Sequence, residues 1–286
     1  MNRSFDIAAV IGVGLLGGSL GLALKARGLA RVVRGAGRRM SSLDTACSMG
    51  AIDEAHLDAR EACRDAELVV ICTPANLVSA KLDEILPCCR ADAVVTDVAS
   101  TKASICGHAR RTWPKPLRFV GSHPMAGSEK FGPEHSYESL YEGSYTIVEP
   151  RQPDHAGDAH EAVCGLWRDV GSRVVELDAA RHDALVARTS HIPHVVAGCL
   201  VELVAGQGDV RPVVGGGFRD TTRVAAGRPS IWRDICLTNR EAILAGLDEF
   251  AGQIDAVRGL VERGDGDGLD TFFQTAQDDR REVLGE

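Results

Sequence analysis

The stretch IAAVIGVGLLGGSLGLALKAR, residues 7–27, decides the fold of this chain. Residues 7–12 are a short apolar run that predicts a buried strand, and residues 16–27 are an apolar segment that predicts a helix. Gly12, Gly14 and Gly17 join the two with the spacing G-x-G-x-x-G. This order of strand, glycine-rich turn and helix is typical of a dinucleotide-binding site.

Each glycine of this turn has a task of its own. Gly12 permits the tight turn, Gly14 lets the backbone approach a pyrophosphate, and Gly17 lets helix and strand pack closely. The free backbone N–H groups at the helix start, at Leu15 and Leu16, face the anion. The alternative is a glycine-rich turn that holds no ligand, and the strand, the spacing and the helix together favour binding.

The rest of the first half alternates short β-branched runs with amphipathic segments, a pattern typical of βαβ units around a parallel sheet. We therefore expect an α/β protein with a Rossmann-type nucleotide-binding domain over residues 1–178. The carboxyl ends of such strands, where ligands bind, carry Gly14, Thr73, Pro74, Ser100 and His123. The predicted strands are residues 7–12, 31–35, 68–72, 93–97, 119–122, 145–149 and 173–177.

The second half, residues 179–286, carries no strand pattern and predicts an all-helical domain. We expect one long helix over residues 229–263, starting at Pro229. Apolar residues recur along it every three or four positions and predict a seam for helix-on-helix packing. We expect this seam to form a homodimer through the C-terminal helices; an ordinary core face within one subunit is the alternative. The seam residues are Ile243, Leu247, Phe250, Ile254, Val257 and Val261.

Composition excludes several classes of protein. The formal net charge of -8 leaves no basic stripe to neutralise phosphates, so we expect no nucleic-acid partner. The nine cysteines are scattered without a CxxC pair, which indicates reduced thiols and a cytoplasmic protein. We also expect no secretory signal, and no segment that is long and apolar enough to cross a membrane.

The cofactor is predicted from the end of the second strand. An NAD-specific site usually carries an acidic residue there to hold the ribose 2′-hydroxyl, and this chain has Gly37 followed by Arg38 and Arg39. No carboxylate repels a 2′-phosphate at this position, and two guanidinium groups could bind one. We therefore expect NADP to be preferred over NAD, with a solvated loop pair as the alternative for the two arginines.

Five segments together resemble the prephenate, arogenate and cyclohexadienyl dehydrogenase family of tyrosine biosynthesis. The glycine-rich segment at 12–19 is shared with many dehydrogenases. The segments at 121–130 and 217–223, in this order and on both halves of the chain, are more specific. The segments are GVGLLGGS at 12–19, DVASTK at 97–102, GSHPMAGSEK at 121–130, SHIPH at 190–194 and GFRDTTR at 217–223.

The resemblance implies a nucleotide-binding domain, a helical dimerisation domain and an active site between them. The reaction would transfer a hydride from the ring carbon that bears the hydroxyl to nicotinamide and release the ring carboxylate as CO2. Formation of an aromatic ring makes the reaction effectively irreversible. The protein then mainly has to orient a small cyclohexadienyl acid and the cofactor, and to manage one proton.

The resemblance also assigns roles to single residues. His123 would accept the proton of the 4-hydroxyl, because an imidazole titrates near neutrality. Ser100 would bond the substrate hydroxyl or the nicotinamide end, and Arg223 would bind a substrate carboxylate. The remaining substrate-binding positions implied are Glu129, His182, Ser190 and Trp232.

Some assignments stay open at this point. Lys102 could line the site or be a solvated helix-start residue, and His191 and His194 are interpreted as pocket-wall or structural residues with no metal. Another two-domain dehydrogenase of the β-hydroxyacid type is an alternative function, and a non-catalytic NADP-binding redox sensor is a second. The sequence does not choose between prephenate and arogenate.

Overall fold

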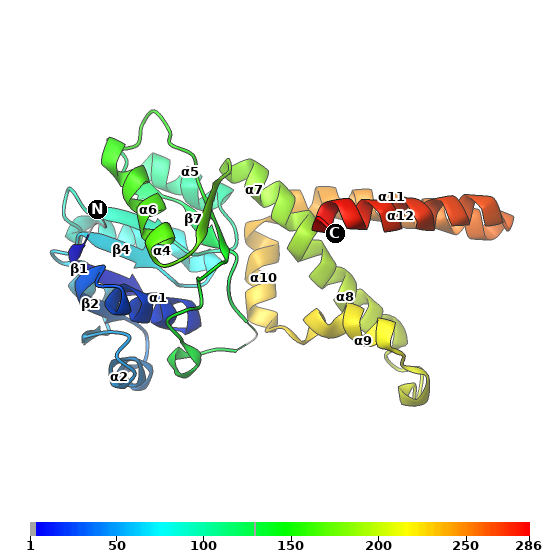
Figure 1. Cartoon of the computed structure of the whole chain (residues 1–286), viewed down its shortest axis with the longest axis horizontal. Coiled ribbons are helices and arrows are strands. Elements are labelled where there is room, and N and C mark those ends of the chain that lie inside the picture. The colour runs from blue at the N-terminus through cyan, green and yellow to red at the C-terminus, as the bar shows by residue number, and fades with distance from the viewer. Residues whose placement is uncertain (1–3, 129) are drawn as a thin grey trace. The chain divides into compact units, whose positions relative to one another are not determined.

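The computed structural model describes residues 4–128 and 130–286 (Figure 1). The chain divides into two compact units, one ending at Arg240 and one beginning at Glu241. The unit up to Arg240 contains every residue predicted for the site.

A six-stranded parallel sheet forms the centre of the first unit, in the order β3-β2-β1-β4-β5-β6. The middle strands β4 and β5 are buried at every residue, which explains their continuous apolar runs. The parallel α/β prediction is therefore confirmed for β1, β2, β4, β5 and β6, whereas β3 was not predicted. Their bounds are β1 Phe5–Ile11, β2 Ala30–Ala36, β3 Glu54–His56, β4 Leu68–Ile71, β5 Val94–Asp97 and β6 Phe119–Val120.

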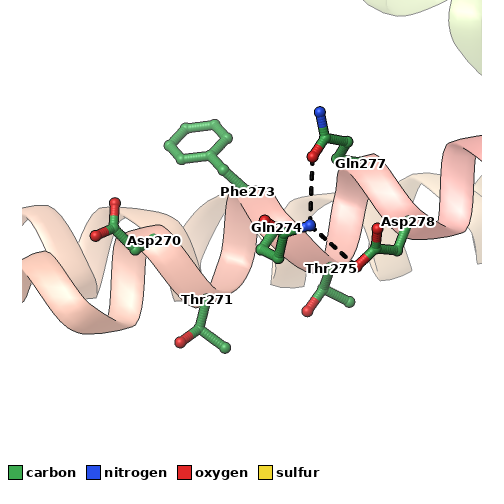
Figure 2. A pocket seen from close by; sticks show the side chains of 7 residues that line it. All are labelled: Asp270, Thr271, Phe273, Gln274, Thr275, Gln277 and Asp278. Carbon is green, nitrogen blue, oxygen red and sulfur yellow. Dashed lines mark hydrogen bonds between the residues drawn. The ribbon is translucent and has the colours of Figure 1, made fainter.

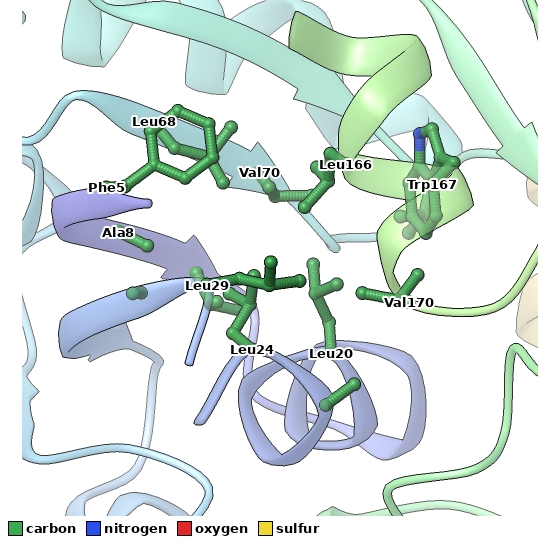
Figure 3. Packing of buried hydrophobic residues seen from close by; sticks show 14 of the residues in the cluster. Phe5, Ala8, Leu20, Leu24, Leu29, Leu68, Val70, Leu166, Trp167 and Val170 are labelled. Atoms are coloured by element: carbon green, nitrogen blue, oxygen red, sulfur yellow. The ribbon is translucent and has the colours of Figure 1, made fainter. Parts of the chain in front are cut away.

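Helices cover both faces of this sheet. On one face Leu20 and Leu24 of α1 and Leu166 and Trp167 of α6 pack against β1 and β4 (Figure 3). A second cluster on other residues of the same strands includes Leu82 and residues of α3, α4 and α5. The helix bounds are α1 Leu15–Ala26, α2 Met40–Ser48, α3 Ala59–Cys63, α4 Ala75–Ile85, α5 Ala103–Thr112 and α6 Gly157–Asp169.

The strand predicted over 119–122 is in fact two strands of different sheets. The chain leaves the parallel sheet at Gly121, where a Cβ atom would lie 2.5 Å from the Cys106 sulfur, so close packing requires glycine here. The next residues form β7 Ser122–Pro124, which pairs antiparallel with β8 Tyr145–Val148, and β8 pairs parallel with β9 Arg173–Glu176. The strands predicted over 145–149 and 173–177 therefore lie in a second, mixed sheet and not in the parallel one.

The chain after β9 is helical in all its described regular elements, as predicted. The expected single helix over 229–263 is broken at Asn239, whose φ of -116 and ψ of 35 are not helical. The buried Asn239 side chain donates to the Asp183 carbonyl oxygen at 2.8 Å and so binds to α7. The elements are α7 Ala179–Val186, a π-helical turn Ala187–His191, α8 Ile192–Val204, α9 Gly216–Thr222, η5 Arg223–Ala226, α10 Pro229–Thr238, α11 Arg240–Arg263 and α12 Gly266–Leu284.

One continuous helix, Ala179–Val204, is long and apolar enough to cross a membrane by length and composition, with a mean hydropathy of 1.2. The expectation that no segment passes this test is therefore wrong. Its polar residues His182, Asp183 and His191 are buried inside the first unit, and a core helix of a folded domain passes the same test. The test alone therefore does not assign this helix to a membrane.

The second unit consists of α12 and all but the first residue of α11, joined by a turn at Gly264 and Asp265 (Figure 1). Gly268 lies against Leu260, because a Cβ there would be 2.6 Å from the leucine side chain. No residue of α12 is buried. All nine cysteines of the chain are free, as the absence of a pairing pattern predicted.

Candidate active site

The glycine-rich turn between β1 and α1 has the geometry that its spacing predicts. Gly12 has a φ of +101, and a Cβ on it would lie 2.7 Å from the Cys72 carbonyl oxygen. A Cβ on Gly17 would lie 2.3 Å from the Gly12 carbonyl oxygen, whereas one on Gly14 would meet nothing within 4 Å. The turn is therefore closed toward the sheet and open at Gly14. There α1 begins without a side-chain cap, so no side chain caps the backbone N–H groups of its first turn, which include those of Leu15 and Leu16.

The end of β4 adds a polar group to this turn. The backbone nitrogen of Thr73 would lie 3.0 Å from a Cβ on Gly12, so the two segments touch. The Thr73 hydroxyl oxygen is buried and has no hydrogen-bond partner among the described residues, and Pro74 is the N-cap residue before α4. A buried hydroxyl without a partner is costly, so the turn and Thr73 fit a bound dinucleotide.

The end of β2 carries the two arginines predicted to select the cofactor. Arg38 and Arg39 are exposed, and Arg39 stands at the start of α2. Within the described part of the chain neither guanidinium forms an ion pair. Gly37 occupies the position of the missing carboxylate, and its N–H donates to the His56 carbonyl oxygen at 3.1 Å. The two charges are therefore available to a ligand.

A buried chain of hydrogen bonds joins His123 to α7. His123 Nδ1 lies 2.9 Å from His182 Nε2, and His182 Nδ1 lies 2.8 Å from an Asp183 carboxylate oxygen. That carboxylate also accepts from the backbone N–H groups of Lys102 at 2.7 Å and Ala103 at 2.8 Å, at the start of α5. His123 is 9% exposed and His182 0%.

The direction of the protons in this chain follows from Asp183. Its carboxylate already accepts two N–H bonds, so it acts as an acceptor toward His182 Nδ1–H. His182 Nε2 is then a bare acceptor, and His123 Nδ1 has to donate to it. This leaves His123 Nε2 with a lone pair. Burial lowers the pKa of His123 well below its ordinary value, which keeps the ring neutral.

The loop after His123 returns to the dinucleotide turn. A Cβ on Gly127 would lie 3.9 Å from the Leu16 side chain. Farther along, the Ser136 hydroxyl donates to the Leu15 carbonyl oxygen at 3.2 Å, and the Tyr141 hydroxyl donates to that of Leu16 at 2.7 Å. The segment that follows His123 is thereby fastened to the start of α1.

Lys102 is not a solvated residue. Its side chain is buried and forms an ion pair with the buried carboxylate of Asp97. The Asp97 carboxylate also accepts from the backbone N–H of Ser122, the residue before His123, at 3.1 Å. Ser100 is half-buried just beyond β5. The next residue, Thr101, donates to the hydroxyl of Thr238 on α10 at 3.1 Å, so this edge contacts the helices.

The helical residues form a second group. The Trp232 ring stacks on His194 with centroids 3.4 Å apart, and His191 lies edge-on to Trp232 at 6.3 Å. Ser190 is half-buried in the π-helical turn, and Arg223 is exposed on η5. No hydrogen bond or ring contact among the described residues joins Arg223 to His123, and Glu129 lies outside the described residues.

Asp183 and Asn239 are the residues of this cluster that the sequence did not single out. The sequence indicates Asp183 only weakly, through its place directly after His182 at the start of a helix. Asp178 caps this helix by accepting from the backbone N–H groups of Ala180 and Arg181. Asn239 gave none, since it lies inside a continuous helical pattern. Both act through tertiary contacts.

The second unit carries a pocket on α12 (Figure 2). All of its lining residues come from that single helix, and none is a predicted site residue. Gln274 bonds to Gln277 and Asp278 along the same helix. We interpret this pocket as a shallow polar surface.

Known proteins define the class to which this arrangement belongs. Residues 20–176 match the family model of the prephenate dehydrogenase nucleotide-binding domain, and residues 178–275 match that of the prephenate dehydrogenase dimerization domain. The chain is an NAD(P)-dependent dehydrogenase with a Rossmann-type domain followed by a helical domain. It belongs to the prephenate dehydrogenase family.

Individual relatives agree over nearly the whole chain. It is 34% identical to a prephenate dehydrogenase of Bacillus subtilis (strain 168), over 98% of this chain and 76% of that protein. It is 32% identical to a cyclohexadienyl dehydrogenase of Zymomonas mobilis, over 96% of this chain and 94% of that protein. Its fold matches a prephenate dehydrogenase of A. aeolicus, solved with hydroxyphenyl propionate and NAD+, with a TM-score of 0.91, 29% identity, and coverage of 99% and 100%. Neither the β-hydroxyacid type nor a redox sensor is favoured by these matches.

Proposed function

We propose that this chain catalyses the oxidative decarboxylation of prephenate, arogenate or both in tyrosine biosynthesis, with His123 as the proton acceptor. The observation that carries the proposal is the buried chain of His123, His182 and Asp183, followed by a loop that is fastened to the dinucleotide-binding turn. An imidazole that is kept neutral and oriented suits a reaction that has to remove one hydroxyl proton.

His123 Nε2 would accept the proton of the substrate 4-hydroxyl as the ring carbon that bears it loses hydride and becomes a carbonyl. The electron pair left by departing CO2 would then return through the ring to that oxygen and form the phenol of the aromatic product. The charge that then develops on the His123 ring is shared with His182 through the Nδ1–H bond, and Asp183 stabilises it in turn. Ser100, at the same strand edge, would hold the hydroxyl or the nicotinamide end. Burial of His123 and His182 excludes water from the proton's path.

NAD(P)+, when bound, supplies the hydride acceptor. Gly12, Gly14, Gly17, Leu15 and Leu16 would hold its pyrophosphate, and the hydroxyl of Thr73, next to Pro74, would gain a partner from it. We propose a preference for NADP, because exposed Arg38 and Arg39 follow Gly37 where an NAD-specific site carries a carboxylate.

The substrate carboxylates would be bound from the helical half. Arg223 is an exposed guanidinium on η5, and η5 packs on α8, which carries His194. Ser190 and the stacked ring of Trp232 would complete this wall, and Glu129 the opposite one. His182, which the sequence also predicted to contact substrate, is fully buried with both ring nitrogens bonded, so it would act behind His123 instead. We also place the domain boundary near residue 178, and propose a soluble, cytoplasmic homodimer joined through the C-terminal helices.

Replacing His123 by Asn tests the proposed function. We expect kcat to fall by about 100- to 10,000-fold, the range that general base catalysis supplies, while NAD(P)+ still binds. His108→Asn, at an imidazole on α5 that pairs with Asp83, is the matched control and should keep full activity. Turnover of prephenate and arogenate by His123→Asn at the wild-type rate would refute the assignment, and absence of turnover of either substrate by the wild-type protein would refute the function.

A further inference from the structure

A cluster of three potential metal ligands lies outside the candidate active site. His160 and Cys164 stand one turn apart on α6, and Glu176 is the last residue of β9. One ligand atom from each lies within 4.8 Å of the other two. His160 Nε2 is 3.5 Å from a Glu176 carboxylate oxygen and 3.8 Å from the Cys164 sulfur.

The two separations from His160 Nε2 are close to those around a tetrahedral zinc ion. With bond lengths of about 2.3 Å to sulfur and about 2.1 Å to nitrogen or oxygen, two such ligands lie roughly 3.4–3.6 Å apart. The two measured separations differ from this by a few tenths of an ångström, which small side-chain rotations can absorb. Imidazole, thiolate and carboxylate are also the ligand set that zinc prefers.

The surroundings of the cluster leave its ligands available. His160 is 6% and Cys164 3% exposed. Within the described residues their polar side-chain atoms have no hydrogen-bond partner except each other, and a contact near 4 Å between sulfur and nitrogen is weak. The Glu176 side chain is 46% exposed, so the cluster opens to solvent on that side. An ion could enter there and keep a water molecule as a fourth ligand.

We propose that His160, Cys164 and Glu176 bind a zinc-type divalent ion that fastens α6 to β9. Strand β9 belongs to the sheet that carries His123, because His123 pairs with Ile147 and Ile147 with Val175. The ion would therefore stabilise the sheet behind the proposed proton acceptor without touching substrate.

Binding has to release a proton from the thiol. A cysteine thiol binds metal as the thiolate, so the metal has to displace the Cys164 proton. The apparent affinity should therefore rise with pH. Solution measurements between pH 6 and pH 8 would show this as a stronger cobalt signal at the higher pH.

Cobalt titration of the full, reduced, metal-stripped chain tests the site. We expect one equivalent of Co²⁺ to give a thiolate-to-cobalt absorption band, and equimolar Zn²⁺ to displace it and raise the melting temperature. Cys164→Ser should lose the band, whereas Cys199→Ser, at an exposed thiol on α8, should keep it. Sites built only from histidines give no thiolate band.

Glu176→Gln keeps the test decisive if Cys164→Ser does not fold. The side chain is partly exposed, so this variant should fold, and loss of the charged ligand should weaken cobalt binding at least about tenfold. The site is disproved if the wild-type chain gives no band, if Cys164→Ser retains it, or if Glu176→Gln binds cobalt as tightly as the wild type. Activity of the metal-free chain should be unchanged.

Discussion

Asp183 is the residue on which the orientation of His123 depends. Its carboxylate fixes the His182 tautomer and so leaves the lone pair of His123 on Nε2. An amide at position 183 presents one acceptor and one donor to three N–H groups. Loss of a hydrogen bond to a charged group costs about 1.5–3 kcal/mol. We therefore expect Asp183→Asn to lower kcat by about 10- to 100-fold and to change the KM for NAD(P)+ little.

Asp178→Asn is the control for this variant. Asp178 caps the same helix, and Asn caps nearly as well as Asp, so activity should remain. Steady-state kinetics with both substrates, and circular dichroism of both variants, provide the comparison. Equal kcat values for Asp183→Asn and Asp178→Asn would show that the carboxylate does not orient His123.

The pH dependence of turnover should show the lowered pKa of His123. A proton acceptor has to be neutral, and burial lowers the pKa of this ring below 6.5. We expect kcat/KM to stay constant as the pH falls through 6.5 and to drop only at lower pH. Because the pKa of His123 is lower in the folded than in the unfolded chain, the free energy of unfolding decreases as the pH falls below 6.5. Tryptophan fluorescence should therefore be used to confirm that the chain is still folded at each pH. An acid limb centred at or above 6.5 would contradict a buried His123 as the base.

Arg38 and Arg39 should distinguish the two cofactors. Their positive charges can bind the 2′-phosphate of NADP, and NAD has no phosphate at that position. Removing both guanidinium groups should cost about 1–2 kcal/mol, which raises the KM for NADP roughly 5- to 30-fold. The KM for NAD should stay unchanged, and Arg111→Ala, at another exposed arginine, should change neither. A wild-type chain that prefers NAD would contradict the proposed preference.

At the scale of elements, two glycines of the turn between β1 and α1 have different roles: Gly17 is needed for stability and Gly14 for cofactor binding. Gly17→Ala would force a Cβ to within 2.3 Å of the Gly12 carbonyl oxygen, and such overpacking costs about 1–3 kcal/mol. We expect it to lower the melting temperature by several degrees.

The Cβ added by Gly14→Ala would meet nothing within 4 Å, so this variant should keep the wild-type melting temperature. It should nevertheless weaken NAD(P)+ binding at least about tenfold, because the Cβ stands where the pyrophosphate approaches. Calorimetry of folding and of cofactor binding checks the pair, and equal cofactor affinity for Gly14→Ala and the wild type would contradict the proposed binding geometry.

The same elements show what the sequence could predict. The β1 turn was predictable because its strand, spacing and helix are local in sequence. The division of residues 119–122 between two sheets was not, because it depends on packing of Gly121 against Cys106, fifteen positions away. The break at Asn239 depends on a bond to Asp183. His123 was found through its motif, while the carboxylate that orients it needed the packing of α7 on α5.

At the scale of the whole molecule, several apolar side chains of the α11 seam remain exposed to solvent in the single chain. Phe250, Ile254 and Val261 are 37%, 52% and 62% exposed, and a matching family model describes this region as a dimerization domain. Burying such side chains gains about 25 cal/mol per Å², so a second copy is the cover we expect. Ile254→Asp would place a charge in that interface and should convert the dimer to a monomer at micromolar concentration. Gln253→Asp adds the same charge on the same helix outside the seam and should leave the dimer intact. Sedimentation equilibrium distinguishes these outcomes, and a dimer of equal strength in both variants would mean that the chain associates through another surface.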